Sequence, residues 1–128
     1  MARTSIPLTN LSANGSIAAP AGTAIDATNG MQVVIPTWAI PRTANVENLV
    51  LILNNTAGSA KQVTVRAGMN PPASQAARGD LTVSVAAGGT RYLGPFESAR
   101  FIQTDATLQI DFESGTTGTV TALLLPRM

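Results

Sequence analysis

The sequence predicts a single all-β domain, an antiparallel β-sandwich of jelly-roll or immunoglobulin-like kind with an extended N-terminal arm. Three observations lead to this fold class. Apolar and polar residues alternate in several short runs, which is the pattern of strands with one buried face. The 11 glycines and 8 prolines interrupt nearly every window long enough for a helix. The 128 residues give room for one domain with one hydrophobic core.

About eight strands are expected. Residues 81–85 and 108–113 alternate apolar and polar side chains, whereas residues 49–53 are apolar on both faces and predict a central strand covered on both sides. Residues 120–125 have a similar character. The full set of predicted strands is 32–35, 49–53, 62–67, 81–85, 90–93, 99–103, 108–113 and 119–124.

Clusters of turn-forming residues separate these runs. Residues 54–58, 86–89 and 114–118 combine Gly with Asn, Ser, Thr or Ala, and each cluster is expected to close a hairpin. The spacing is typical of sandwiches, in which short strands alternate with short turns.

The first thirty residues differ from the remainder, so residues 1–30 are interpreted as the arm and residues 31–128 as the sandwich. The arm carries isolated apolar residues, among them Ile6, Leu8 and Leu11, which are too few to form a core of their own.

Two placements of the arm are open. It adds a strand to the sheet edge of another subunit, with Ile6, Leu8 and Leu11 as assembly contacts, or it folds back on its own domain. In the first case, deletion of residues 1–12 is expected to leave the fold intact and to weaken attachment.

Composition restricts the partners. Charged residues make up only 12% of the chain and the mean hydropathy is +0.20, so we expect neighbouring subunits to cover part of the surface. The formal net charge is +1 with scattered basic residues, which argues against nucleic acid as a partner. The longest apolar runs have about five residues, which predicts no membrane span and no secretory leader.

The chain lacks the residues that most enzymes use. Without His or Cys it has neither the commonest general base nor a thiol, so we expect no enzyme, no cofactor and no metal. Asp111 and Glu113 could hold a hard cation or act in glycoside hydrolysis, but the polar face of a strand is the favoured interpretation. Arg78-Gly79-Asp80 spells an adhesion tripeptide and is interpreted as turn chemistry.

Residues 35–41 form an apolar connection that two prolines hold in shape. We expect assembly contacts at Pro36, Trp38, Ile40 and Pro41, because a preorganised loop loses little entropy on docking. The alternative is that this loop lines the core of its own domain. Trp38 and Tyr92 are the residues that a sugar-stacking platform would use, but aromatic residues make up only 4% of the chain and these two fall in unrelated segments.

The segment from residue 48 to residue 127 resembles small β-sandwich head proteins of tailed bacteriophages. The similarity lies in the pieces NLVLILNNTAG, QVTVRAGMNPPA, GDLTVSV, YLGPFESARFIQ and TLQIDFESGTTGTVTALLLPR. The element from Gly94 to Phe101, followed by a short strand and the closing TVTA strand, prompts the comparison.

Resemblance to capsid decoration (cement) proteins implies a virion structural protein. Such a protein would be made in the host cytoplasm, bind the major capsid protein on the outer capsid surface as a homotrimer, and stabilise the shell. The alternatives are another phage head-tail or fibre component and a carbohydrate-binding or adhesion module.

Overall fold

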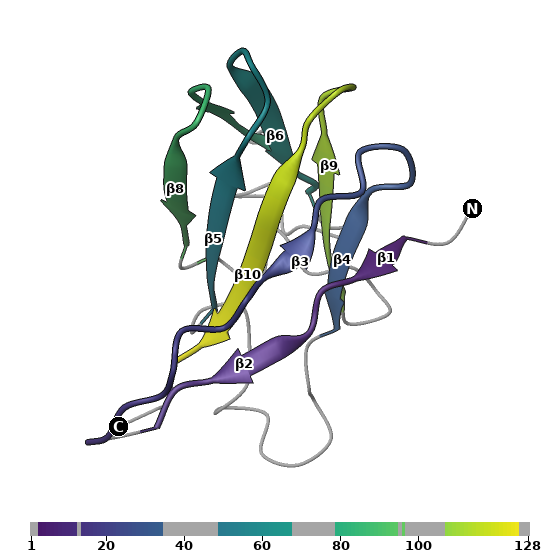
Figure 1. The fold of residues 1–128 in the computed structure, drawn as a ribbon. Helices are drawn as coiled ribbons and strands as arrows, with labels where there is room; N and C mark the ends of the chain where they lie inside the picture. The colour runs from purple at the N-terminus through teal and green to yellow at the C-terminus, as the bar shows by residue number, and fades with distance from the viewer. Residues whose placement is uncertain are drawn as a thin grey trace.

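The structure is a computed structural model that describes residues 3–12, 14–34, 49–67, 79–94, 96 and 107–125. The described chain contains ten strands and no helix (Figure 1). The strands are β1 (Thr4–Ser5), β2 (Leu8–Asn10), β3 (Thr23–Ala24), β4 (Met31–Val34), β5 (Leu49–Asn55), β6 (Lys61–Val65), β7 (Leu81–Val85), β8 (Thr90–Leu93), β9 (Thr107–Phe112) and β10 (Gly118–Leu124).

The strands form two sheets that face each other. Sheet A has the order β1-β4-β9-β6-β7, and sheet B has the order β2-β10-β5-β8 with β3 also paired to β10. The predicted all-β sandwich is therefore confirmed. Its sheets are mixed and not purely antiparallel, because β1 pairs in parallel with β4 and β2 in parallel with β10.

Seven of the eight predicted strands are present, two of them with the predicted bounds. Periodicity located most of them because one face of each is buried against the opposite sheet. Residues 90–93 are instead delimited by the glycine turn before them and by Gly94-Pro95 after them. The eighth, residues 99–103, lies outside the described residues. Strands β1, β2 and β3 were not predicted, since two or three residues are too few to show a period of two.

The core lies between the sheets. The alternate residues of the long strands point inward, so that β5 buries Leu49, Leu51 and Leu53 completely or nearly so. The remaining members of the buried cluster are Ile6, Met31, Val33, Val63, Val65, Val85, Leu93, Phe96, Leu108, Ile110, Phe112, Val120, Ala122 and Leu124. Burial of this apolar surface is the main stabilising contribution to the fold.

Strand β5 is central, as predicted, but its two faces are not equally covered. Its inward residues are buried, whereas Val50, Ile52 and Asn54 on the outward face are only half-buried. Strand β10 alternates in the same way over its second half. The sequence pattern predicted that a second layer covers the outward face of β5. The half-buried outward residues do not support that prediction.

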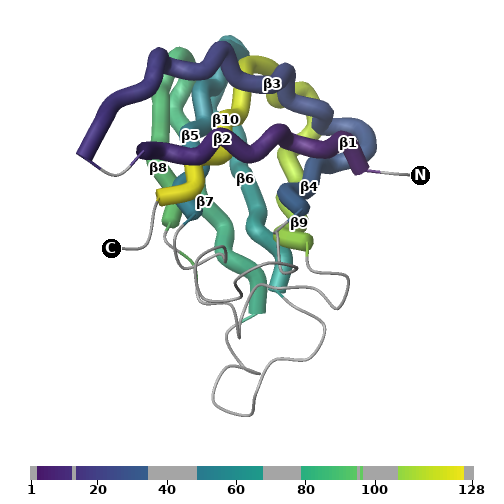
Figure 2. Tube along the Cα trace, turned by 90° about the horizontal axis from the view of Figure 1, so that it is seen from below, coloured from purple at the N-terminus to yellow at the C-terminus, as the bar shows by residue number. Residues whose placement is uncertain are grey.

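The N-terminal segment pairs with both sheets of its own domain in the described structure, so the extended arm is not confirmed and the fold-back placement is the one observed. It pairs with β4 of sheet A through β1 and then with β10 of sheet B through β2, so that it crosses from one sheet to the other (Figure 2). Ile6 lies at the crossing with 3% of its surface exposed. Its N–H donates to the Gln32 carbonyl at 2.8 Å, which ties the crossing to sheet A.

A buried Asn joins two turns at one end of the sandwich. The Asn55 Nδ2 donates to the carbonyl oxygens of Ser59 at 3.1 Å and Val85 at 3.0 Å, while its Oδ1 accepts from the Ala57 N–H at 2.9 Å. The side chain is 2% exposed and fully hydrogen-bonded, as a buried amide requires. It connects the turn that runs from β5 of sheet B to β6 of sheet A with the end of β7 in sheet A.

Replacing Ile6 with Ala should lower the free energy of unfolding by about 2 to 4 kcal/mol, because it leaves a cavity between the sheets. Urea denaturation measures the loss. The matched control is Ser5→Ala, since Ser5 is the exposed neighbour on β1 and should change stability by less than about 0.5 kcal/mol. Equal midpoints for Ile6→Ala and the unmodified chain would contradict the crossing described above. On the same grounds, deletion of residues 1–12 is no longer expected to leave the fold intact.

Candidate functional site

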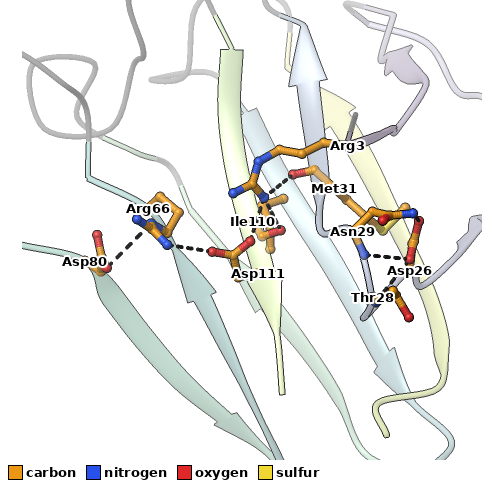
Figure 3. A network of polar contacts seen from close by, with 9 residues as sticks. All are labelled: Arg3, Asp26, Thr28, Asn29, Met31, Arg66, Asp80, Ile110 and Asp111. Carbon is orange, nitrogen blue, oxygen red and sulfur yellow. Dashed lines mark hydrogen bonds and ion pairs between the residues drawn. The ribbon is translucent and has the colours of Figure 1, made fainter. Parts of the chain in front are cut away.

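The outer face of sheet A carries a chain of ion pairs (Figure 3). Arg3 Nη1 lies 2.6 Å from Asp111 Oδ1, and Arg66 Nη1 lies 2.9 Å from Asp111 Oδ2. Arg66 also faces Asp80, with Nε and Oδ2 separated by 3.8 Å. The network links β9 to the N-terminal segment on one side and to the end of β6 on the other.

Arg3 holds β1 in place by a main-chain hydrogen bond as well as by its ion pair. Its Nη1 also donates to the Ile110 carbonyl at 3.2 Å, so the guanidinium lies against the β9 main chain. Gly30 leaves the space that this arrangement needs: a Cβ at that position would collide with Arg3 Nη1 and approach Asp111 Oδ1 to 2.7 Å. Gly30 also has a φ of +74°, which disfavours other residues there.

The pKa of the Asp111 carboxyl is below its ordinary value. Burial is the largest single influence and acts to raise the pKa, but the hydrogen bonds and positive charges of Arg3 and Arg66 together outweigh it. Asp111 is therefore ionised in the folded chain at neutral pH and serves as the shared anion of two cations.

A second set of hydrogen bonds, all to the Asp26 carboxylate, holds β1 beside the turn that precedes β4. The Thr4 Oγ1 donates to Asp26 Oδ2 at 2.6 Å, and the N–H groups of Thr28 and Asn29 donate to Asp26 Oδ1, each at 3.1 Å. The hydrogen bond from Thr4, followed by those from Asn29 and Thr28, lowers the pKa of Asp26. The carboxylates of Asp26 and Asp111 thus both fasten the N-terminal segment to sheet A.

Asp111 and Glu113 were considered above as a site for a cation or for glycoside hydrolysis. In the structure both carboxylates make contacts to residues on or next to neighbouring strands. Glu113 Oε1 accepts from the Gln62 N–H at 2.9 Å, and Glu113 Oε2 lies 3.7 Å from Lys61 Nζ. These contacts agree with the polar strand face that the sequence favoured. Within the described residues no group of three or more acidic side chains is placed to hold a metal ion.

Asp80 of the adhesion tripeptide has an intramolecular role. Its Oδ1 accepts from the Ala67 N–H at 2.7 Å, and its Oδ2 faces Arg66. It therefore holds the end of β6 near the start of β7, as expected for turn chemistry. Arg78 lies outside the described residues.

The outer face of sheet B differs sharply in charge from that of sheet A. Strand register sets Tyr92, Ile52 and Thr121 side by side across β8, β5 and β10, and sets Val50 beside Leu123. Tyr92 is 72% exposed. The outward positions of these three strands hold no charged residue and are Val50, Ile52, Asn54, Thr90, Tyr92, Thr119, Thr121 and Leu123. We call this set the uncharged face.

A small hollow adjoins the uncharged face at β10. It measures about 200 Å³, and Thr121 belongs both to the face and to its lining. The other lining residues are Pro7, Thr9, Pro20, Ala21, Gly22, Thr23 and Val120. Typical small-molecule sites are larger, at roughly 300 to 1,000 Å³, so the hollow suits one apolar side chain better than a cofactor.

The predicted assembly contacts have different environments. Ile6 is buried in the core of its own chain, so it is not available as a surface contact, and Leu8 packs partly buried against the same core. Leu11 is half-buried, and its N–H donates to the Leu124 carbonyl at 2.9 Å. The other four, Pro36, Trp38, Ile40 and Pro41, lie outside the described residues.

The comparisons with known proteins give no relative. No protein-family model, curated protein or solved structure matches this chain. The part of the chain that the structure describes contains no helix long and apolar enough to cross a membrane. A role for the chain is therefore inferred from the surfaces of the sandwich.

Replacing Asp111 with Asn should flatten the acid side of the stability profile. The folded chain binds a proton at Asp111 less readily than the unfolded chain does, so the network stabilises the fold above the unfolded pKa. This contribution is lost in the acid window that begins at the unfolded pKa of about 3.9 and extends below it, through the lower pKa of the folded chain. Thermal unfolding across this window measures the effect.

The matched control is Gln109→Ala, because Gln109 is the neighbouring outward position on β9 and carries no charge. It should keep the acid slope of the unmodified chain. An Asp111→Asn variant with an unchanged slope would show that the ion pairs add nothing to the pH dependence of folding.

Proposed function

We propose that this chain is a virion structural protein, a capsid decoration protein that attaches to the outer surface of a phage head and stabilises the shell. The observation that carries the proposal is the uncharged face of sheet B. The ion pairs lie on sheet A, so a partner that covers the outer face of sheet B removes water from uncharged residues only. The electrostatic cost of that desolvation is low.

The composition of the uncharged face suits a flat protein partner. Tyr92 is the kind of exposed aromatic anchor that contributes strongly to interfaces, and it stands next to Ile52 in the β5–β8 register. Threonine hydroxyls at positions 90, 119 and 121 surround the apolar residues and can exchange hydrogen bonds with a partner. The adjoining hollow would take one apolar side chain from that partner.

The proposed mechanism is stabilisation by mass action. A protein that binds only the assembled shell shifts the equilibrium toward that shell, by an amount set by its concentration relative to its dissociation constant. Weak contacts that repeat around a symmetric lattice reinforce one another when copies are linked. The resemblance of residues 48–127 to phage head proteins supports the major capsid protein as the partner.

Replacing Tyr92 with Glu should abolish attachment to the shell while leaving the fold intact, because it puts a charge where the partner would remove water. Co-sedimentation with empty heads of the phage that encodes the chain measures attachment. The matched control is Gln32→Glu on the outer face of sheet A, which should bind like the unmodified chain.

Two results would count against this role. Unmodified protein that stays in the supernatant at every concentration would remove the shell as a partner. Retention on an immobilised glycan, lost in the Tyr92 variant, would instead favour the carbohydrate-binding alternative.

The proposal includes a homotrimer, the form in which a decoration protein matches a local three-fold position. Light scattering of the unmodified chain across micromolar concentrations should give a mass three times the 13.1 kDa of one chain. A monomer at every concentration would contradict pre-assembly and would leave attachment one subunit at a time.

A further inference from the structure

The outer edge of β7 is an open sheet edge in the described structure. Strand β7 is last in the order of sheet A, and within the described residues it pairs only with β6. Open edges expose main-chain donors and acceptors that can pair with another strand, so proteins usually guard them with charges, prolines or bulges. Residues 81–85 read Leu-Thr-Val-Ser-Val and contain no such guard.

The neighbouring hydrogen bonds show which residues of β7 present these groups. The Glu113 N–H donates to Gln62 and the Arg66 N–H donates to Gln109, so alternate residues of β6 bond to β9. The residues between them, at positions 61, 63 and 65, bond to Val85, Val83 and Leu81. The N–H and C=O groups of Thr82 and Ser84 therefore point away from β6, toward the open edge.

The other edges of the two sheets are guarded. Strand β8, the corresponding edge of sheet B, places Arg91 opposite Leu53 of β5, on the core-facing side of an edge strand. That is one of the devices that prevent edge pairing. Strand β1 is two residues long and follows Arg3, and β2 is three residues long and follows Pro7. Strand β7 is thus the longest unguarded edge in the described chain.

We propose that β7 pairs antiparallel with β7 of a second copy of this chain, about a two-fold axis at Val83. The sequence of β7 is self-complementary in this register: Val83 meets Val83, Thr82 meets Ser84, and Leu81 meets Val85. Apolar residues then meet on the core side and hydroxyls meet on the outer side, which are favourable cross-strand pairs. Because the strand holds no charge, the symmetry brings no like charges together.

The main-chain geometry fits the same register. Thr82 and Ser84 have the outward groups, and each Thr82–Ser84 pair exchanges two hydrogen bonds, as directly opposed bonded pairs do in antiparallel sheets. The two cores also become continuous, because Leu81 and Val83 are only partly buried in the single chain and pack against its core. The contact is isologous and closes after two copies.

This contact is separate from the proposed attachment to a shell, which uses the other sheet. It would join chains of two different trimers across a two-fold axis, so the trimer mass is expected at concentrations below those at which trimers pair. Its test needs no knowledge of the shell.

Introduced thiols give a direct readout, since the chain has no Cys. Thr82→Cys and Ser84→Cys are purified separately, mixed under mild oxidation and compared with each variant alone. In the proposed register a Cys at position 82 faces a Cys at 84 with their Cα atoms about 5.5 Å apart, within disulfide range. Two copies of either variant place their thiols about 9 Å apart at Cα, beyond that range.

The mixture should therefore form the mixed disulfide about tenfold more than either variant forms its own disulfide, measured on non-reducing gels and by mass spectrometry of the linked peptide. Thr90→Cys, an exposed position on the outer side of β8, is the control and should cross-link with neither variant above background. Adding Ser84→Pro to the Thr82→Cys chain should remove its cross-linking with the Ser84→Cys chain, because the outward donor is lost.

Three outcomes would overturn the proposal. Equal yields from the mixture and from each variant alone would rule out this register. Background yields in all samples would rule out a second copy as the occupant of the edge. Cross-linking that persists with Ser84→Pro would show that the contact does not use the main chain of β7.

Discussion

The fold depends on one constraint: strand β10 needs partners on both of its edges. Strand β5 pairs along one edge over seven residues, while β2 and β3 share the other. The segment that supplies β2 also supplies β1 to sheet A and places Ile6 between the sheets. Without it, the inward residues of β10 and β4 would face water on that side. The segment that supplies β1 and β2 has too few apolar residues to form a core of its own, yet the core between the two sheets needs it as a cover.

The same segment adds one charge to the network on sheet A. Arg3 precedes β1 and reaches Asp111, which also holds Arg66, so three ionised groups are gathered on sheet A by the docking of the N-terminus. Exposed ion pairs stabilise a fold only modestly. These ion pairs lie on sheet A, whereas the outward positions of β5, β8 and β10 are uncharged because of the residues that the sequence places there.

The sequence allowed most strands to be predicted and little of how they pair. Residues 81–85 were located at their observed bounds because their alternation follows from one face that is more buried than the other. Residues 90–93 were located because glycines and a proline delimit them in the sequence. Strands β1 and β2 gave no such signal, and their parallel partners are 27 and 114 residues away. Arg3 and Asp111 are 108 residues apart in the chain, so nothing local indicated that they meet. The uncharged face shows only once the register of β5 with β8 and β10 is known.

The uncharged face and the open edge would contact partners by different physics. A flat face gains from removing water around Tyr92 and Ile52, an effect that is non-directional and is not screened by salt. An edge gains from hydrogen bonds that form in one register only, which fixes orientation at the cost of a small contact area. The face lies on sheet B and the edge on sheet A, so one contact does not block the other. A small sandwich with both can bind one partner by its face while the edge sets the angle between neighbouring copies.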